Sequence, residues 1–323
     1  MKTVLVTGAS GWLGAAIAQA LVARGDRVIG MDLGVSDALA ALARRSGNLV
    51  PLVGDLGEWG QVTAAFRDHA PDAVVHCAAI VGVVACADIP VKALRVNVEG
   101  SINLFEAMRQ SGVKRVVHIS TEETYGDFLA PRIDEDHPQR PTSFYGATKL
   151  ATELNGRVYS RMHGLECINV RTCWVYGPNL PRARVPKTFI DAALRGVPHH
   201  LATGGDLAVD QVYIADTVDG VLLALDKERH RFDSYNVATG VAPTIADVAA
   251  IVNAGVPGAR ITTEPGEYLH GGRVPTAKKG ALDIGRARSE LGYEPRYDIR
   301  RGIEATIEAA RADLARARAV PAA

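Results

Sequence analysis

The sequence has little of what marks disulfide-rich, fibrous or disordered proteins. Only four of its 323 residues are cysteine, namely Cys77, Cys86, Cys167 and Cys173, and no two of them form a Cys-x-x-Cys motif. A disulfide framework is therefore not expected, and free thiols in a reducing compartment are the default. Apolar residues make up 47% of the chain and charged residues 22%. These values are close to the average for globular proteins and exclude a disordered, collagen-like or coiled-coil chain.

The sequence also lacks an excess of charge of one sign and a long hydrophobic run. Lysine and arginine number 36, as do aspartate and glutamate, so global charge gives no argument for a nucleic-acid partner. The longest apolar stretch, 73–87, contains His76 and Gly82 and falls short of a membrane span. The apolar run after Met1 is shorter than the core of a signal peptide. We expect a cytoplasmic protein that binds neither nucleic acid nor membranes.

The order of apolar and amphipathic segments predicts an α/β fold. In the first half of the chain, short apolar runs typical of buried strands alternate with stretches of helical periodicity. The expected strands are 4–6, 28–31, 50–53, 73–76, 115–119 and 167–170, and the helices between them include 12–23, 61–68, 91–110 and 147–162. Such alternation indicates a doubly wound parallel sheet with helices on both faces.

The composition changes after Tyr176-Gly177-Pro178, where the segment to about residue 205 is rich in proline and arginine. A chain of this length is expected to hold about two domains. We therefore expect a first domain over 1–177, to which 206–240 returns. A smaller C-terminal α/β domain would consist of 178–205 and 241–323.

A glycine-rich turn connects the first expected strand to the first expected helix. Gly8, Gly11 and Gly14 stand in the order Gly-x-x-Gly-x-x-Gly. Gly8 permits the tight turn, Gly11 lets the backbone approach a pyrophosphate, and Gly14 lets the helix pack close to the strand. The N–H groups and the dipole at the start of the helix favour phosphate. The dinucleotide-binding residues expected here are Gly8, Ser10, Gly11, Trp12, Leu13 and Gly14.

An acidic residue at the end of the second expected strand distinguishes between two dinucleotides. Asp32 can accept hydrogen bonds from the 2′-hydroxyl of an adenosine ribose and would repel a 2′-phosphate, which favours NAD over NADP. Asp55 and Leu56, after the third expected strand, would suit the adenine edge, although the pair also fits an ordinary turn. The alternative for the whole pattern is a plain strand-to-helix turn followed by a surface aspartate.

A tyrosine and a lysine stand four residues apart in Tyr145-Gly-Ala-Thr-Lys149. On a helix this spacing places both side chains on one face. A free tyrosine has a pKa near 10 and is not a base at neutral pH. A lysine ammonium and an oxidised nicotinamide close to the phenol favour the phenolate and lower that pKa. The pair is therefore suited to moving a proton to and from an alcohol.

Together these motifs resemble the extended short-chain dehydrogenase/reductase family, of the NAD-dependent epimerase/dehydratase type, over essentially the whole chain. The resemblance implies a Rossmann-type NAD-binding domain followed by a substrate-binding domain. It implies that Tyr145 takes a hydroxyl proton while a hydride passes to NAD, that Thr121 hydrogen-bonds the reacting oxygen, and that Lys149 also holds the nicotinamide ribose. Further cofactor contacts that it implies are Cys77, Ala78, Ala79, Asn97 and, near the nicotinamide, Pro178.

The run Thr121-Glu122-Glu123 resembles the Thr-Asp-Glu of nucleotide-sugar 4,6-dehydratases. There the two acids serve as general acid and general base for eliminating water once the ketone has formed. The resemblance implies that Glu122 and Glu123 act on the keto intermediate and that Glu123 also contacts the substrate. The alternatives are that one or both glutamates face solvent, or that they bind a hydroxyl of a polyol.

Two positions depart from the nucleotide-sugar pattern. Trp174 stands where relatives commonly carry Asn, and Asp210-Gln211 stands where they commonly carry Arg-Asp. That arginine grips the nucleotide diphosphate by charge-assisted hydrogen bonds, whereas an aspartate would repel it.

Three arginines are candidate replacements for the missing one. Arg273, ten residues before Asp283, stands where relatives place another diphosphate-binding arginine, and Arg182 and Arg184 could bind a carboxylate or a smaller phosphate. A solvated surface position is the alternative for each. Trp174 could line the substrate pocket or lie in the core. The expected substrate contacts are Thr121, Glu123, Trp174 and Arg273.

Three interpretations of function follow. In the first, which we favour, the protein uses NAD to oxidise a secondary hydroxyl of a sugar-like substrate, epimerises or dehydrates the ketone, and returns the hydride. In the second, suggested by Asp210 and Trp174, it is a net NAD-dependent dehydrogenase of a smaller polyol or sugar acid. In the third it is a catalytically silent dinucleotide-binding sensor, against which intact Thr121, Tyr145 and Lys149 argue.

We expect no bound metal, and we expect one protein partner, a second copy of this chain. His199 and His200 are adjacent and therefore lack the spacing of paired metal ligands on a helix, and no cysteine cluster supports them. Helices corresponding to 91–110 and 147–162 form a four-helix dimer interface in many relatives, so the resemblance implies a homodimer. Their outer faces could equally be solvated.

Overall fold

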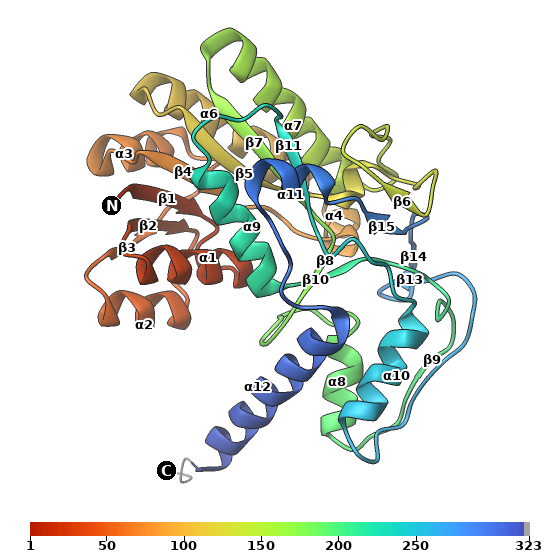
Figure 1. Cartoon of the computed structure of the whole chain (residues 1–323). Helices are drawn as coiled ribbons and strands as arrows, with labels where there is room; N and C mark the ends of the chain where they lie inside the picture. The colour runs from red at the N-terminus through yellow and green to blue at the C-terminus, as the bar shows by residue number, and fades with distance from the viewer. Residues whose placement is uncertain (320–323) are drawn as a thin grey trace.

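Seven parallel strands form the central sheet of the protein. The computed structural model describes residues 1–319 (Figure 1), and the strand order is β3-β2-β1-β4-β5-β7-β11. Each neighbouring pair runs parallel. The strands are β1 (Thr3–Thr7), β2 (Arg27–Asp32), β3 (Leu49–Val53), β4 (Ala73–His76), β5 (Arg115–Thr121), β7 (Glu166–Thr172) and β11 (Ser234–Val237). This order confirms the predicted doubly wound, Rossmann-type sheet.

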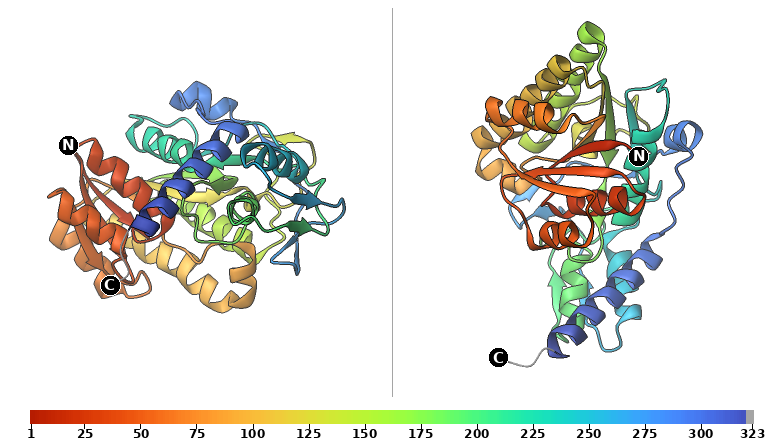
Figure 2. Two further views of the ribbon diagram at one scale, coloured as in Figure 1. Left: turned by 90° about the horizontal axis from the view of Figure 1, so that it is seen from below. Right: turned by 90° about the vertical axis from the view of Figure 1, so that its left-hand side faces the viewer.

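Helices cover both faces of the sheet (Figure 2). Residues on the two faces of the strands belong to two separate hydrophobic cores. In β1, Val4 and Val6 face one core and Leu5 faces the other, as the two-residue period of a strand requires. The first core is covered by α1 (Trp12–Ala23), α2 (Asp37–Arg45), α9 (Ile214–Asp226) and α11 (Gly285–Leu291). The second is covered by α3 (Trp59–His69), α6 (Gly100–Ser111) and α7 (Phe144–His163).

A smaller lobe with its own hydrophobic core is built mainly from residues after Tyr176. Its core includes Trp174, Phe189, Val248 and Ile303. The helix α10 begins with a capping box in which Thr244 and Asp247 satisfy each other's backbone N–H groups. The helices of this lobe are α8 (Lys187–Leu194), α10 (Ile245–Gly255) and α12 (Ile299–Ala319), and its paired strands are β8 (Trp174–Tyr176) with β10 (Gln211–Tyr213), β9 (His199–Leu201) with β12 (Ile261–Thr263), and β13 (Leu269–His270) with β14 (Val274–Pro275).

Short elements lead from the sheet into the site. Between β4 and α6 the chain forms α4 (Val83–Asp88), α5 (Pro90–Leu94) and a π-helical turn, η1 (Arg95–Glu99). After β5 it forms a 3₁₀ turn, η2 (Glu122–Thr124). The strand β6 (Arg132–Ile133) then pairs with β15 (Ala281–Leu282), which brings a distant segment beside the loop after β5.

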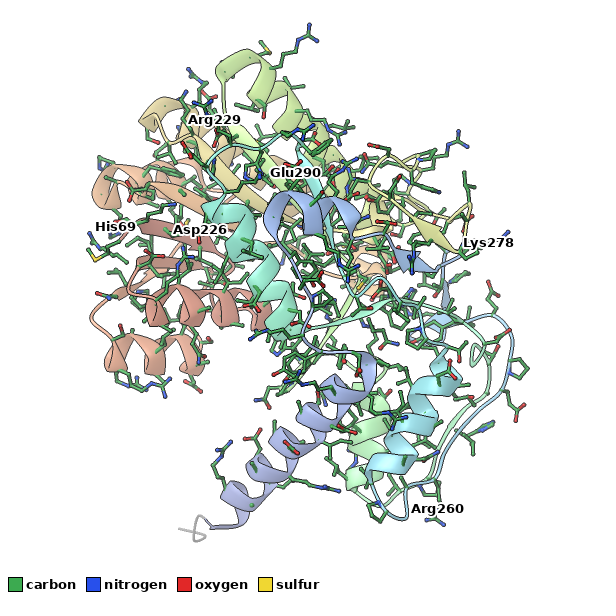
Figure 3. All side chains as sticks on the ribbon, in the orientation of Figure 1. His69, Asp226, Arg229, Arg260, Lys278 and Glu290 are labelled. Carbon is green, nitrogen blue, oxygen red and sulfur yellow. The ribbon has the colours of Figure 1, made fainter. Side chains whose placement is uncertain are left out.

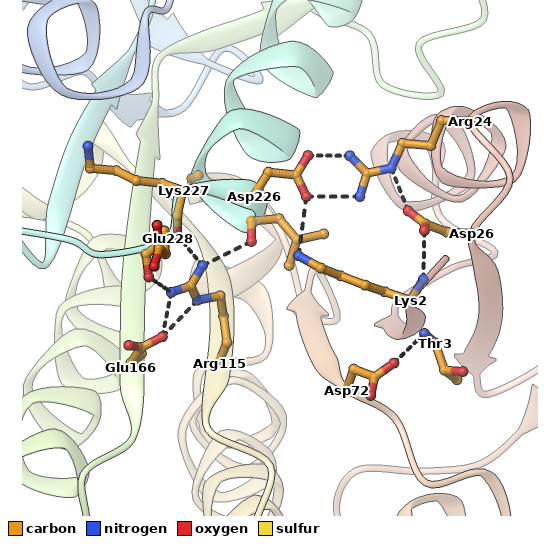
Figure 4. Close-up of polar contacts among 12 residues, drawn as sticks. Lys2, Thr3, Arg24, Asp26, Asp72, Arg115, Glu166, Asp226, Lys227 and Glu228 are labelled. Atoms are coloured by element: carbon orange, nitrogen blue, oxygen red, sulfur yellow. Dashed lines mark hydrogen bonds and ion pairs between the residues drawn. The ribbon is translucent and has the colours of Figure 1, made fainter.

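Charged side chains join the amino ends of the strands (Figure 4). At the starts of β5 and β7, Arg115 Nη2 donates to Glu166 Oε2 at 2.6 Å. Arg24, at the end of α1, pairs with Asp26 and with Asp226 of α9. These pairs close the amino edge of the sheet and leave the loops at the carboxyl edge for a ligand, as in other open α/β sheets. No helix within residues 1–319 is both long and apolar enough to cross a membrane.

Candidate active site

The glycine loop after β1 has the shape that a pyrophosphate requires. Gly8 has a φ of 70°, and a Cβ there would lie 2.7 Å from the backbone nitrogen of Ala78. A Cβ on Gly14 would lie 2.1 Å from the carbonyl oxygen of Gly8. Gly11 is the N-cap of α1, and no side chain of residues 1–319 caps this end, which leaves the N–H groups for phosphate oxygens. The loop therefore fits the diphosphate of NAD.

Asp32 is fixed beside this loop at the end of β2. The backbone N–H of Ser10 donates to Asp32 Oδ2 at 2.9 Å, and that of Leu33 donates to Oδ1 at 2.8 Å. The carboxylate retains acceptor capacity, since its two oxygens offer about four lone-pair sites. Its position therefore fits the adenosine ribose of NAD.

The turn after β3 holds the two residues expected at the adenine edge. Asp55 Oδ1 accepts a hydrogen bond of 2.8 Å from the Gly57 N–H, and Leu56 is buried in the core between β3, α3 and α6. Contact of Asp55 and Leu56 with adenine stays a prediction.

Trp12 connects the glycine loop to a segment far along the chain. Its indole N–H donates to the carbonyl oxygen of Pro178 at 2.7 Å, across 166 residues. Leu13, the next residue, packs against the hydrophobic core that α1, α2, α9 and α11 cover. The bond holds Pro178 beside the start of α1, and contact of Pro178 with the nicotinamide stays a prediction.

Asn97 supports the turn after β4. In η1, the Asn97 side-chain amide accepts from the Ile80 N–H at 2.7 Å and donates to the Ile80 carbonyl at 3.0 Å. It also donates to Thr148 Oγ1 on α7 at 2.9 Å. Asn97 thus ties the Cys77-Ala78-Ala79 strand end to α7, and its direct contact with the cofactor stays a prediction.

Tyr145 stands in the first turn of α7, close to the end of β5. The helix begins where Ser143 Oγ accepts from the Gly146 N–H at 3.1 Å. A Cβ on Gly146 would lie 2.3 Å from the carbonyl oxygen of Glu123, so glycine here lets α7 approach η2 closely. Burial raises the pKa of the Tyr145 phenol, and Arg182 opposes this rise. The lowering of this pKa by Lys149 together with an oxidised nicotinamide stays a prediction.

Lys149 lies one turn further along α7 and is held by a histidine. Its Nζ lies 3.1 Å from His118 Nε2, and His118 Nδ1 lies 2.9 Å from Asn169 Oδ1. The amide nitrogen of Asn169 donates to the Asp233 carbonyl at 3.1 Å, so its oxygen faces His118. His118 therefore carries its proton on Nδ1 and accepts from Lys149 through Nε2. Burial lowers the pKa of Lys149 to about 8 and holds that of His118 well below its usual value.

Thr121 ends β5 and leads directly into two buried carboxylates. Its Oγ1 accepts from the Glu123 N–H at 3.3 Å. Lys279 Nζ lies 2.8 Å from Glu123 Oε1 and 3.6 Å from Glu122 Oε1. Both glutamates are buried, which removes the alternative that they face solvent. The structure thus gathers Thr121, Tyr145, Lys149 and both acids around the carboxyl end of β5.

Lys279 and His118 are site residues that the sequence analysis missed. Lys279 is 156 residues from Glu123, and in the sequence it forms an unremarkable pair with Lys278. His118 precedes Thr121 by three residues on β5, which places their side chains on opposite faces of the strand. A histidine inside a buried apolar strand was the available signal for His118, and the sequence held none for Lys279.

The Asp210 carboxylate is held by hydrogen bonds within the protein. Its Oδ1 accepts from the backbone N–H and the hydroxyl of Thr239 at 3.0 and 2.6 Å. Its Oδ2 accepts from the Gly240 N–H at 2.9 Å and the Leu282 N–H at 3.3 Å. The carboxylate is fully buried and pins β15 to the turn after β11. The expectation that it repels a diphosphate is therefore not supported.

Trp174 is buried in the core of the smaller lobe, against Tyr268 and His270. The guanidinium of Arg184 lies 4.8 Å from the centre of its ring. Nη2 of Arg184 donates to the Val175 carbonyl at 3.1 Å. Within residues 1–319, Arg184 forms no ion pair with a carboxylate, so its charge is available to an anion.

The other two arginines are engaged at the surface. Arg273 is half exposed and pairs with Asp88 at the end of α4, with 2.5 Å between Nη2 and Oδ1. Arg182 donates to the Val81 carbonyl at 3.2 Å. Both contacts join the smaller lobe to the segment after β4. Binding of substrate by Arg273 stays a prediction. In the part of the chain that the structure describes, no group of three or more His, Cys, Asp or Glu side chains is placed to hold a metal ion.

Comparison with known proteins gives a consistent set of relatives. Residues 4–238 match the NAD dependent epimerase/dehydratase family. A UDP-glucose 4-epimerase of Mycolicibacterium smegmatis is 31% identical over 315 residues, covering 95% of this chain and 98% of the other. A dTDP-glucose 4,6-dehydratase of Xanthomonas campestris is 29% identical over 336 residues, covering 95% and 93%.

Solved structures agree over the same length. UDP-glucose 4-epimerase of Thermotoga maritima with UDP-glucose has a TM-score of 0.86 at 27% identity, covering 97% of this chain and 99% of that one. UDP-glucose 4-epimerase of Thermus thermophilus in complex with NAD has a TM-score of 0.82 at 31% identity, covering 96% and 99%.

Proposed function

The chain belongs to the NAD-dependent epimerase/dehydratase family, and from this premise we propose that it oxidises a secondary hydroxyl of a sugar nucleotide, transforms the ketone and returns the hydride. Enzymes of this family are NAD-dependent and act on sugar-like substrates. The choice of a sugar nucleotide, and of the step that follows oxidation, is the proposal.

The residues at the end of β5 and the start of α7 have distinct parts in this proposal. Thr121 Oγ1 hydrogen-bonds the reacting oxygen, and Tyr145 takes the hydroxyl proton. Lys149, held by His118, supplies a positive charge on the same helix face. Bound oxidised NAD would accept the hydride and add the charge that stabilises the Tyr145 phenolate.

The single observation that carries the proposal is the buried pair Glu122 and Glu123 beside Thr121, bridged by Lys279. A net dehydrogenase needs only a group that moves the hydroxyl proton and a hydride acceptor. Two carboxyl groups buried next to the reacting position supply an acid and a base for a second step on the ketone. Elimination and enolisation both need such groups.

Arg184 is our candidate for the substrate's diphosphate. It is half-buried, its guanidinium stacks on Trp174, and no carboxylate of residues 1–319 pairs with it. A guanidinium without an anionic partner suits a phosphate through bidentate hydrogen bonds. Arg184 would then replace the arginine that is absent at position 210, and Trp174 would position it.

The alternative of a net dehydrogenase loses one of its two supports. Asp210 favoured a net dehydrogenase because its charge would repel a diphosphate. Its carboxylate instead accepts hydrogen bonds from backbone N–H groups of the protein. The other support was Trp174, which stands where relatives commonly carry Asn. Its ring lies against the guanidinium of Arg184, which can supply a polar contact at this place. The alternative of a silent sensor leaves the buried carboxylates without a purpose.

We also propose a homodimer through α5 and α7. On α7, Leu154, Val158 and Met162 follow one another at helical spacing and are each about half exposed or more. Val91 and Leu94 on the adjacent α5 are similarly exposed. Exposed apolar side chains on two adjacent helices are typical of a protein interface. Val158→Asp should give a monomer in sedimentation analysis, whereas Leu129→Asp, at another exposed leucine, should not.

A thermal-shift panel with saturating NAD tests the substrate class. We expect at least one UDP, dTDP or GDP sugar to raise the melting temperature, because a bound ligand stabilises the folded state. The matching free monosaccharides, sugar acids and polyols are the controls. Stabilisation by a sugar acid or polyol but by no nucleotide sugar would contradict the proposal and favour the net dehydrogenase.

A further inference from the structure

Glu122, Glu123 and Lys279 form a buried cluster of three ionisable groups, here called the carboxylate–lysine cluster. The side chain of Lys279 has no exposed area, and those of Glu122 and Glu123 expose 1% and 9%. Two buried carboxylates around one ammonium cannot both be ionised without leaving an uncompensated charge, and such a charge is strongly destabilising. One carboxyl group of the cluster is therefore expected to stay protonated.

The geometry distinguishes the two glutamates. Glu123 Oε1 accepts from Lys279 at 2.8 Å, and its Oε2 lies 3.5 Å from Ser143 Oγ. Neither carboxylate oxygen of Glu122 has a hydrogen-bond partner among residues 1–319. Burial raises the pKa of Glu122 to about 7. Burial also acts to raise the pKa of Glu123, but the charge and hydrogen bond of Lys279 outweigh it and hold that pKa below its usual value.

Other ionisable groups around the cluster do not replace Lys279. Arg184 and Asp210 act on Glu122 in opposite directions. His270 is uncharged at neutral pH, because burial lowers its pKa to about 4. Buried Tyr145 and Cys173 are uncharged as well, since burial raises the pKa of each. Lys279 is thus the cation in direct contact with the pair.

Backbone contacts on both sides fix Lys279 in place. The Lys278 N–H donates to Asp127 Oδ1 at 2.7 Å, and the Phe128 N–H donates to the Lys278 carbonyl at 3.0 Å. A Cβ on Gly280 would lie 2.3 Å from the Pro131 carbonyl, so only glycine allows this approach. The neighbouring Lys278 lies exposed at the edge of the molecule (Figure 3).

We propose that Lys279 is a positioning residue whose charge makes Glu122 and Glu123 hold one proton between them, with that proton on Glu122. The pair then presents one acid and one base at neutral pH, as a proton transfer in each direction requires. The chemical use of this arrangement rests on the proposed function. The proton count itself does not depend on any substrate.

Carbon-13 NMR of the glutamate side-chain carboxyl groups in the full chain tests this directly. Signals are assigned with Glu122→Gln and Glu123→Gln and followed against pH. We expect Glu123 to be ionised and Glu122 protonated at about pH 6. In Lys279→Met, the titration midpoint of Glu123 should rise by about 2 pH units, as for a buried carboxyl without a partner. Lys279→Arg should keep the wild-type midpoints, and Lys278→Met is the matched control.

An unchanged midpoint of Glu123 in Lys279→Met overturns the proposal, as does an ionised Glu122 in the wild type at about pH 6. If Lys279→Met does not fold, Glu122→Gln decides. Removing the titrating partner should leave Glu123 ionised at about pH 6 and paired with Lys279, and a protonated Glu123 there would refute the assignment. A wild type with the expected titration but no hydride transfer on any nucleotide sugar would refute the proposed function alone.

Discussion

Lys149 Nζ lies 3.1 Å from His118 Nε2 in the interior of the protein. His118 is neutral and is oriented by Asn169, so it can accept a hydrogen bond from the ammonium form of Lys149. Burial lowers the pKa of Lys149 to about 8. The ammonium is therefore present below about pH 8 and is lost as the pH rises through that value.

Replacing His118 should move the alkaline limb of the activity profile. In His118→Leu the ammonium loses its acceptor, so the pKa of Lys149 should fall, and activity should decline at a pH about 1 unit lower. His118→Gln offers an amide oxygen in a similar place and should keep most of the wild-type profile. The measurement is the rate of hydride transfer against pH. Identical alkaline limbs in the wild type and His118→Leu would show that this contact does not set the charge of Lys149.

Tyr145→Phe should reduce hydride transfer by about 100-fold or more, because the proton of the substrate hydroxyl loses its acceptor. Binding of NAD, measured by calorimetry, should change little. Tyr159→Phe on the same helix removes a hydroxyl that lies 3.4 Å from Glu106 Oε2 and is the matched control. Retention of most of the turnover by Tyr145→Phe would contradict the assignment.

Gly14→Ala should weaken NAD binding at least tenfold and destabilise the protein by about 1–3 kcal/mol, as expected for an overpacked site. The new Cβ would lie 2.1 Å from the carbonyl oxygen of Gly8 and must push α1 away from the loop. Gly60→Ala, in α3, meets no atom within 4 Å and should be neutral or slightly stabilising. Calorimetric titration and thermal unfolding of both variants check this, and equal NAD affinities would be contrary to it.

The pH dependence of stability should carry the signature of Glu122. Its pKa rises from 4.5 to about 7 on folding, so the folded protein keeps a proton that the unfolded chain has released. Stability from this group is complete below about pH 4.5 and is lost as the pH rises to about 7. The difference is on the order of 3 kcal/mol.

Glu122→Gln should therefore remove this part of the pH dependence of stability. The measurement is the free energy of unfolding, determined by urea denaturation at pH values between 4.5 and 8. Comparison with the wild type cancels the contributions of the buried histidines, which act in the opposite direction. Parallel stability curves for the two proteins would show that Glu122 is not protonated in the fold.

Arg184→Met should raise the KM for a nucleotide sugar about tenfold with a smaller change in kcat, because a charge-assisted hydrogen bond to phosphate is lost on binding. Arg195→Met, at an exposed arginine that follows α8, is the control. An unchanged KM for the Arg184 variant would remove this residue from the binding site.

Much of the fold follows from local sequence patterns. The strands of the sheet are short apolar runs, and the alternation of Val4, Leu5 and Val6 between two cores is a direct consequence of the strand period. The glycine loop and the pair Tyr145 and Lys149 are also local, since each lies within one turn or one helix start. These features could be predicted because the physical constraint and the residues lie together in the sequence.

The electrostatics of the site could not be predicted in this way. Lys278 and Lys279 are equivalent in the sequence, and only the pairing of β15 with β6 buries one of them beside the carboxylates. The interpretation of Asp210 as a charge that repels a diphosphate failed for the same reason. Its hydrogen-bond partners, Thr239, Gly240 and Leu282, come from later segments of the chain. Burial raises the pKa of Tyr145, and this burial comes from the whole fold and not from the local Tyr-x-x-x-Lys motif.

Retention of NAD(H) by the purified protein distinguishes recycling of the cofactor in place from net oxidation. The retained cofactor is measured after extensive dialysis by denaturing the protein and quantifying what is released. A cofactor that is reduced and reoxidised in place need not leave, so we expect close to one NAD(H) per chain. An empty site that binds NAD reversibly, with net formation of NADH during turnover, would contradict it and identify a simple dehydrogenase.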